Sequence, residues 1–241
     1  MRYAVLSDVH GNLEALTAVL EAADESGADA LLCLGDLVGY GPDPNEVVEL
    51  VRARGATAVR GNHDEAAIQP GRETRFNAWG QDAIRWSRRR LTGENHEYLG
   101  ALPLAAVVDG VLLVHACASE PDTWRYILDL DEAAVEFTAF KERLCLFGHS
   151  HIPLAVESAG RRTSVLEGDR VIFEDGKRYM VNVGSVGQPR DGDPRAAFGL
   201  LDLDLGTLLI RRVEYDAAAT RAKIIDAGLP VFLGDRLLKG R

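Results

Sequence analysis

Cysteine is scarce in this sequence, whose 241 residues include only Cys33, Cys117 and Cys145. Each lies within or just after an apolar run, and the three form neither a CxxC pair nor a spacing typical of a disulfide framework. We expect buried thiols, because unpaired cysteine is among the most frequently buried residues. A redox role and a thiolate metal site are both disfavoured.

Long hydrophobic runs are also missing. No apolar stretch is long enough to cross a bilayer, and the first strand-like run begins at residue 3, leaving no room for a basic leader segment. The sequence therefore predicts a soluble cytoplasmic protein. Its 46% hydrophobic and 27% charged residues predict one domain over residues 1–241 with a sizeable core.

Basic residues are in deficit, with 27 lysines and arginines against 37 acidic residues and a formal net charge of −10. Proteins that bind long nucleic acids neutralise many phosphates with Lys and Arg, so this balance argues against such a partner. A small anionic substrate would instead need a local positive centre. We therefore expect a small anionic substrate and no membrane partner; the oligomeric state stays open.

Five apolar runs each end in polar residues that can bind metals. They are YAVLS before Asp8 and His10, ALLCLG before Asp36, ATAVRG before Asn62, His63 and Asp64, VLLV before His115, and LCLFG before His149 and His151. Helical patterns separate the first three runs, which predicts a βαβαβ unit with parallel strands. The polar residues then lie at strand carboxyl ends, where ligands bind in open α/β sheets.

The rest of the chain predicts three further regions. Residues 66–102 read as a helical segment near the mouth of the site. Beyond His151, short strands indicate a second, mostly antiparallel sheet, with a hairpin turn at Asp175 and Gly176. The tail at about 216–241 reads as helical, with a break from Gly228 to Pro230.

Five of the six histidines lie in the motifs at the strand ends, and only His96 does not. One such histidine is usually a packed core residue, but five beside carboxylates and an amide indicate metal binding. Nitrogen and oxygen ligands without thiolate suit Mn, Fe, Zn, Co or Ni rather than a structural zinc site. The candidate ligands are too many for one ion and fit two divalent ions.

The order of these motifs over residues 7–151 resembles the calcineurin-like metallophosphoesterases. The later stretch GSVGQPRDGDPRAAF and the AGLP tail look similar to a bacterial and archaeal phosphodiesterase branch. The resemblance implies an α+β fold, a four-layer αββα sandwich with two mixed β-sheets face to face and helices outside.

The resemblance also implies a division of the metal ligands. One ion would be held by Asp8, His10, Asp36 and His151, and the other by Asp36, Asn62, His115 and His149. Two neighbouring cations need a shared anion, which Asp36 would supply as a bridge. The expected nucleophile is a metal-bridging hydroxide, since bound ions lower the pKa of water.

The function implied is hydrolysis of phosphodiesters or phosphoanhydrides of small or nucleotide-type molecules. A phosphomonoesterase and a catalytically silent scaffold of the same fold are the alternatives. Retention of every expected ligand and of His63 favours the enzyme. His63 is expected to donate a proton to the leaving oxygen or to stabilise phosphoryl charge, with Asn62 and His63 contacting the substrate.

One departure concerns the Gly-Asp motif at Asp36. In the protein Ser/Thr phosphatase branch this motif continues into an acidic residue that partners the catalytic histidine, followed by a phosphate-binding arginine. Here Gly39 and Tyr40 occupy those positions. Protein phosphatase activity is therefore disfavoured, and the orienting partner of His63 stays open.

Several other residues carry two interpretations. The loop at residues 184–195 can be a simple turn, which we favour, or can bind phosphate through Gly amides and Arg190 or Arg195. Loop aromatics can stack on a base or only pack; they are Tyr40, Trp124 and Tyr126. Asp64 can orient the site or cap a helix, and Asn12 is expected to be a cap.

Overall fold

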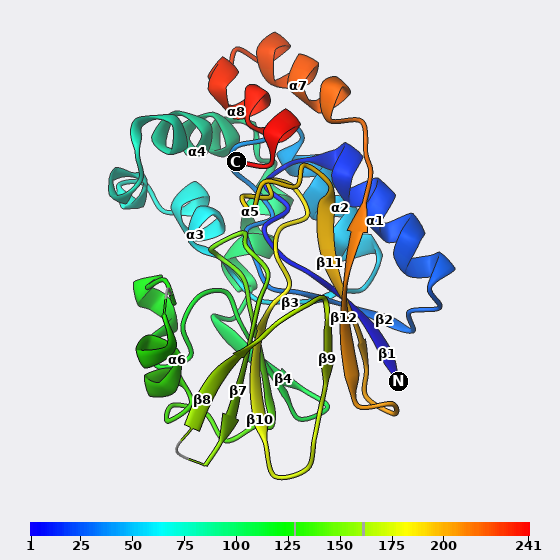
Figure 1. Ribbon diagram of the computed structural model, residues 1–241. Helices are drawn as coiled ribbons and strands as arrows, with labels where there is room; N and C mark the ends of the chain where they lie inside the picture. The colour runs from blue at the N-terminus through cyan, green and yellow to red at the C-terminus, as the bar shows by residue number, and fades with distance from the viewer. Residues whose placement is uncertain (128, 161) are drawn as a thin grey trace.

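The computed structural model describes residues 1–127, 129–160 and 162–241, and two six-stranded β-sheets pack face to face in it (Figure 1). The first sheet has the order β3-β2-β1-β11-β12-β9. Its parallel half is β1 (Arg2–Leu6), β2 (Ala30–Cys33) and β3 (Thr57–Ala58), and its antiparallel half is β11 (Ala196–Asp202), β12 (Thr207–Val213) and β9 (Arg170–Ile172).

The second sheet has the order β4-β5-β6-β10-β7-β8. Its strands are β4 (Ala105–Val108), β5 (Val111–Val114), β6 (Leu144–Phe147), β10 (Arg178–Asn182), β7 (Leu154–Ala159) and β8 (Arg162–Leu166). β5, β6 and β10 run parallel, and the outer pairs are antiparallel. Buried side chains such as Val5, Leu113 and Val181 fill the space between the sheets.

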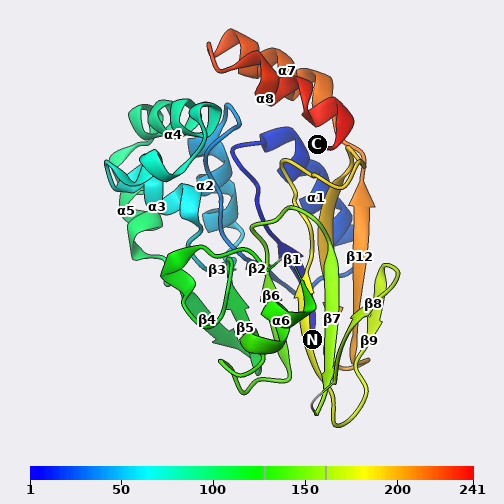
Figure 2. The same cartoon turned by 60° about the vertical axis from the view of Figure 1, so that its left-hand side comes forward.

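Helices cover both outer faces (Figure 2). α1 (Leu13–Glu25) and α2 (Pro44–Ala53) bury their apolar faces against the first sheet, and α6 (Leu130–Glu136) packs beside β7 and β8 of the second. α1 begins where predicted, because the Asn12 side chain accepts a hydrogen bond from the backbone N–H of Ala15. The predicted four-layer α+β sandwich is confirmed.

Strand pairing differs from the prediction in the second half of the chain. β9, β11 and β12 were expected in the second sheet, but they complete the first one, with β11 antiparallel to β1. The Asp175 and Gly176 turn is no hairpin, because β9 pairs with β12 and β10 pairs with β6 and β7. A turn dipeptide specifies local backbone only, whereas packing between distant segments selects the partner strand.

Further helices gather at the carboxyl ends of β1, β2 and β3. They are α3 (Asn62–Ile68), the 3-10 turn η1 (Arg72–Arg75), α4 (Ala78–Arg90) and α5 (Gly93–Ala101), and from the tail α7 (Ala217–Asp226), α8 (Val231–Asp235) and the turn η3 (Leu237–Lys239). Both views show α7 and α8 above α1 and α4 at this end. A short turn, η2 (Pro121–Thr123), precedes α6.

All three cysteines are buried and unpaired, as expected from their apolar surroundings. Among the described residues, no helix has both the length and the apolarity that a bilayer crossing requires.

Candidate active site

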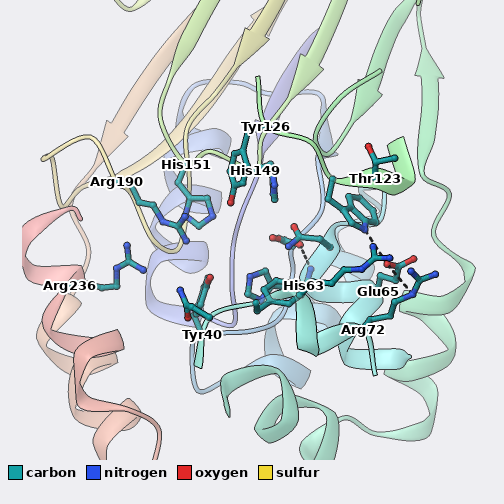
Figure 3. Close-up of a pocket in the computed structure, with 16 residues that line it drawn as sticks. Tyr40, His63, Glu65, Arg72, Thr123, Tyr126, His149, His151, Arg190 and Arg236 are labelled. Carbon is teal, nitrogen blue, oxygen red and sulfur yellow. Dashed lines mark hydrogen bonds and ion pairs between the residues drawn. The ribbon is translucent and has the colours of Figure 1, made fainter. Parts of the chain in front are cut away.

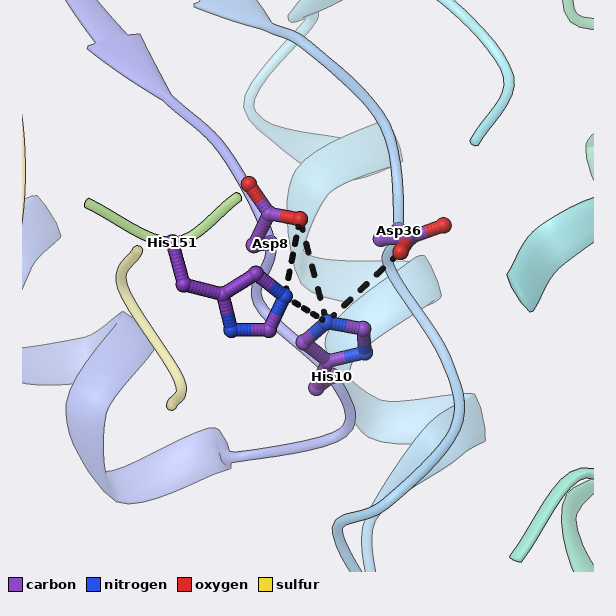
Figure 4. Close-up of side chains that lie close together, drawn as sticks. All are labelled: Asp8, His10, Asp36 and His151. Atoms are coloured by element: carbon purple, nitrogen blue, oxygen red, sulfur yellow. Dashed lines mark hydrogen bonds and ion pairs between the residues drawn. The ribbon is translucent and has the colours of Figure 1, made fainter. Parts of the chain in front are cut away.

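The motifs that follow five strands meet at one edge of the sandwich. Two groups of side chains place potential metal-binding atoms within 4.8 Å of one another, and these groups are Asp8, His10, Asp36 and His151, and Asp36, His115 and His149. Figure 4 shows the first group. Asn62 adjoins the second, because its Oδ1 lies 3.0 Å from Nε2 of His115. The structure therefore brings all seven predicted ligands together, and Asp36 belongs to both groups.

Backbone carbonyls fix the orientation of three imidazole rings. Nδ1 of His10 donates to the Val38 carbonyl at 3.1 Å, Nδ1 of His115 to Leu34 at 2.7 Å, and Nδ1 of His151 to Gln188 at 2.7 Å. Because a carbonyl can only accept, each neutral ring carries its proton on Nδ1 and presents a lone pair on Nε2. Second hydrogen bonds of this kind orient metal-binding histidines.

The inward-facing atoms are acceptors that lack donors. Nε2 of His10 and Nε2 of His151 are 3.1 Å apart, and Oδ1 of Asp8 and Nε2 of His149 are buried without a hydrogen-bond partner. Buried acceptors facing one another are unfavourable unless a cation lies between them. Ligand atoms about 2.1 Å from one ion lie roughly 3.0–3.4 Å from each other, so this spacing fits divalent metals.

Charges within the cluster keep its carboxylates ionised. Burial acts to raise the pKa of Asp8, but the neighbouring His151 and His115 hold it well below its usual range. The pKa of Asp36 is likewise well below its usual value, because His115 and His63 outweigh its burial. Both side chains are therefore negatively charged at neutral pH and could bind a cation.

The histidines differ in whether burial or the neighbouring carboxylates dominate their pKa values. Burial lowers the pKa of His149 to about 3, and it lowers those of His10 and His151. Burial acts in the same direction on His115, but Asp36 and Asp8 outweigh it and raise its pKa to about 9. A metal ion bound by the same carboxylates would compete with that proton, since ligand histidines must be neutral.

Backbone strain is concentrated at this edge. Residues other than glycine rarely have positive φ, and each such residue costs of order 1–3 kcal/mol. The described chain has eight, and seven of them belong to the site: Asp8, His10, Asp36, Tyr40, Trp124, His149 and His151, with φ between 52° and 68°. The chain therefore turns sharply after β1, β2 and β6, where Asp8, Asp36 and His149 enter the site.

Asp64 connects the turn after β2 to the turn after β3 by hydrogen bonds. Its carboxylate accepts hydrogen bonds from the backbone N–H groups of Asp36 at 2.8 Å, Val38 at 3.1 Å and Gly61 at 3.0 Å. Burial, followed by the charge of Asp36, raises its pKa to about 7, and the donors act against this rise. Asp64 therefore both caps α3 and orients the loop that carries Asp36.

His63 is held by packing and by its own backbone. Its N–H donates to Oδ1 of Asp36 at 2.8 Å, and its ring lies 4.4 Å from that of Tyr40 and 4.6 Å from that of Phe76. Nδ1 is buried without a hydrogen-bond partner. A Cβ at Gly39 would lie 2.4 Å from this nitrogen, so no side chain can partner it from that position. Burial lowers the pKa of His63 to about 4.

A cavity of about 390 Å³ opens onto the cluster (Figure 3). Its lining includes the cluster residues Asp36, Asn62, His63, His149 and His151, the acidic Glu65, and four arginines, Arg72, Arg75, Arg190 and Arg236. Arg72, Arg75 and Arg236 were not predicted. Arg72 and Arg75 lie in η1, and Arg236 lies between α8 and η3. None of them belongs to a recognisable motif, so only tertiary packing reveals them.

Of the other candidate substrate contacts, the three aromatic residues line the cavity and Arg195 does not. Tyr40, Trp124 and Tyr126 all line the cavity, and the Tyr126 ring stacks on His149 at 4.0 Å. Arg195 pairs instead with Asp193 at 2.6 Å, outside the cavity lining.

The loop at residues 184–195 is more than a turn. The Gln188 carbonyl orients His151, and Ser185 Oγ donates to the carbonyl of Asp8 at 2.8 Å. The same loop carries Arg190 into the cavity. It therefore helps to hold the cluster, although we favoured a simple turn.

A sequence model of the calcineurin-like phosphoesterase superfamily domain matches residues 1–206. The chain belongs to this superfamily. It is 38% identical over 243 residues to an uncharacterised protein of Methanocaldococcus jannaschii, covering 99% of this chain and 98% of that one. It is 26% identical over 215 residues to the phosphodiesterase YfcE of Escherichia coli, covering 85% and 89%.

One solved structure is similar to this chain over its full length. The crystal structure of a metallophosphoesterase from Sphaerobacter thermophilus is 39% identical, with a TM-score of 0.88 over 100% of this chain and 99% of that one. The predicted family is confirmed, and the chain is a phosphoric ester hydrolase of the metallophosphoesterase type. Its Asp and His groups can hold metal.

Proposed function

We propose that this protein is a dinuclear metal-dependent phosphoesterase that cleaves phosphodiesters or phosphoanhydrides of small or nucleotide-type substrates. The observation that carries the proposal is the pair of overlapping ligand groups that share Asp36. Asp8, His10 and His151 would complete one ion's coordination, and Asn62, His115 and His149 the other's. Mn, Fe, Ni, Co and Zn all suit this nitrogen and oxygen donor set.

Bound divalent ions would supply charge neutralisation of the phosphoryl group and a water of lowered pKa. The chain's own residues would do the rest. Asn62 and His63 follow each other at the start of α3, where both face the cavity. His63 would hold a proton for the leaving oxygen or stabilise phosphoryl charge, and Arg190 would bind substrate oxygen atoms.

The size and charge of the cavity support a small anionic substrate. A volume of about 390 Å³ falls within the range of about 300–1,000 Å³ usual for small-molecule sites. Its four arginines face two lining carboxylates, Asp36 and Glu65, among the described residues. This local excess of positive charge lies in a protein of net charge −10. YfcE, a relative, is named a phosphodiesterase.

The test is metal analysis combined with turnover of bis-p-nitrophenyl phosphate. Protein stripped by chelator should be inactive, and Mn, Ni, Co, Fe or Zn added singly should restore activity with two equivalents bound. A parallel screen of phosphorylated metabolites would identify the substrate. Full turnover by metal-free protein, or two bound ions with no turnover of any phosphoester, would refute the proposal.

A further inference from the structure

Two arginines from distant parts of the chain lie on one side of the cavity. Arg190 comes from the loop at residues 184–195, and Arg236 lies between α8 and η3 in the tail. Figure 3 shows both beside Tyr40 and His151, across the cavity from Arg72 and Glu65. The guanidinium carbon of Arg190 is 5.7 Å from the centre of the Tyr40 ring.

Neither guanidinium has a side-chain carboxylate partner within the described chain. Arg190 donates from Nη2 to Oε1 of Gln188 at 2.9 Å, and its Nε is buried without a partner. Nε of Arg236 donates to the main-chain oxygen of Arg241, the last residue of the sequence, and its terminal nitrogens make no hydrogen bond to the residues that the structure describes. By contrast, Arg72 on the opposite side lies 3.9 Å from Glu65.

Holding two partly buried cations together is unfavourable without a counter-ion. Burial, followed by the charge of Arg190, lowers the pKa of Arg236 to about 10. An anion between them would remove this repulsion and accept hydrogen bonds from both, and phosphate suits the planar donor fork of arginine.

The C-terminal tail packs closely against the loop at residues 184–195, and this contact fixes the distance between Arg190 and Arg236. The N–H of Gly192 donates to the carbonyl of Gly240 at 2.8 Å. Gly240 has φ +61°, and a Cβ there would lie 2.5 Å from the carbonyl carbon of Asp193. Leu233 and Leu237 are buried in one cluster with Tyr40, which seats the tail over the cavity wall.

We propose that Arg190 and Arg236 form a second anion subsite, which binds the phosphoryl group adjacent to the one held at the metal cluster. The subsite borders the first ligand group, because the backbone N–H of Arg190 donates to the carbonyl of His151 at 3.2 Å. It selects phosphoanhydrides over simple diesters. This inference rests on the proposed function. Arg236 lies beyond residues 1–206, the part that matches the superfamily domain.

The test uses two phosphonates that differ in one group and bind metals only weakly in solution. Butylphosphonate carries the phosphonate alone, and 3-phosphonopropionate adds a second anion, a carboxylate. Calorimetry on the manganese-loaded protein should show that 3-phosphonopropionate binds about tenfold more tightly, as expected for charge-assisted hydrogen bonds. Arg236→Gln and Arg190→Gln should each remove most of that difference, while Arg236→Gln leaves the affinity for butylphosphonate within about twofold.

The matched control is Arg221→Gln, which removes the same charge from the same tail. Arg221 pairs with Asp235 at 2.7 Å and does not line the cavity, so this variant should keep the tenfold difference. Thermal unfolding of each variant checks the fold. The proposed subsite would be refuted if wild type bound both phosphonates with equal affinity. It would also be refuted if Arg236→Gln lowered the affinity for both phosphonates by the same factor. Because calorimetry needs no turnover, an inactive protein that keeps the difference would refute only the proposed function.

Discussion

At the scale of single residues, Asp36 contacts both groups of candidate metal ligands. Its Oδ2 lies 3.6 Å from Nε2 of His10 and 3.3 Å from Nε2 of His115, so it faces both ligand groups. Its Oδ1 meanwhile accepts from the backbone of His63. A Cβ at Gly61 would lie 2.1 Å from that oxygen, so glycine leaves the space in which the carboxylate sits.

Replacing Asp36 should affect both metals, whereas replacing His10 should affect one. Asp36→Asn removes the shared negative charge, so we expect fewer than two metal equivalents and loss of binding at both sites. His10→Ala should retain one equivalent, because His115 and His149 stay in place. Elemental analysis after dialysis measures this, and two full equivalents in Asp36→Asn would contradict the bridging role.

His63→Ala should keep both metals and lose activity in a way that depends on the leaving group. General acid help is typically worth about 10²–10⁴ in rate, and a poor leaving group needs it most. We expect a much larger loss of kcat for an alkyl or nucleoside leaving group than for p-nitrophenolate. Equal losses would indicate charge stabilisation, and loss of metal would make His63 a ligand.

Gly39 provides an independent way to disturb His63. A Cβ there would lie 2.4 Å from its Nδ1, at a φ of +88° that strains any other residue. Gly39→Ala should therefore displace the ring and reproduce the leaving-group pattern of His63→Ala, with metal content unchanged. Steady-state kinetics on the same two substrates tests this, and wild-type kcat on both would show that the ring is not confined by Gly39.

At the scale of elements, one partly buried ion pair anchors the segment that carries Arg72 and Arg75. Nη2 of Arg88 in α4 lies 2.7 Å from Oε2 of Glu73 in η1. The same carboxylate oxygen accepts from the N–H of Gly71 at 2.8 Å. Arg88 therefore contributes to positioning the wall of the cavity.

The Glu73 pair should make stability depend on pH. The hydrogen bond from Arg88 lowers the pKa of Glu73 from 4.5 to about 2. A carboxylate with a lowered folded-state pKa stabilises fully above about 4.5, and this stabilisation is lost as the pH falls through about 2.

Urea unfolding of metal-free Glu73→Gln and wild type at pH 6 and pH 3 checks this pH dependence. The variant should be less stable by about 1 kcal/mol at pH 6, and the difference should shrink at pH 3. A difference that stays constant between the two pH values would show that Glu73 acts through packing rather than through its charge.

At the scale of the whole molecule, the site joins both sheets, because its candidate metal-binding residues follow β1, β2 and β3 of the first sheet and β5 and β6 of the second. The buried carboxylates and facing ring nitrogens strain this junction. Metal ions bound there would link the two sheets and relieve the repulsion.

Metal should therefore stabilise the entire fold. A ligand at about 100 times its Kd adds about 2.7 kcal/mol, which shifts Tm by roughly 5–10 °C in a chain of this size. Calorimetric scans should show Tm rising when manganese is added to chelator-treated protein, with a smaller rise in Asp36→Asn. A Tm independent of metal in the wild type would contradict a metal centre between the sheets.

The sequence by itself determined which candidate ligands gather at the site and the parallel half of the first sheet. Apolar runs ending in Asp8, Asp36 or His115 need no knowledge of distant contacts, because strand carboxyl ends of one sheet edge meet in space. Helix caps such as Asn12 are equally local, because its side chain accepts a hydrogen bond from the backbone N–H of Ala15, three residues further along the chain.

Only the tertiary structure decided which strands pair and which arginines line the cavity. By their local pattern, β11 and β12 could pair with strands of either sheet. Contacts between distant segments decided that β11 pairs with β1 and β12. Arg236 reaches the site because the tail docks on the loop at residues 184–195, through contacts nearly fifty residues apart in sequence. No local motif encodes such a contact, since it depends on the shape of both surfaces.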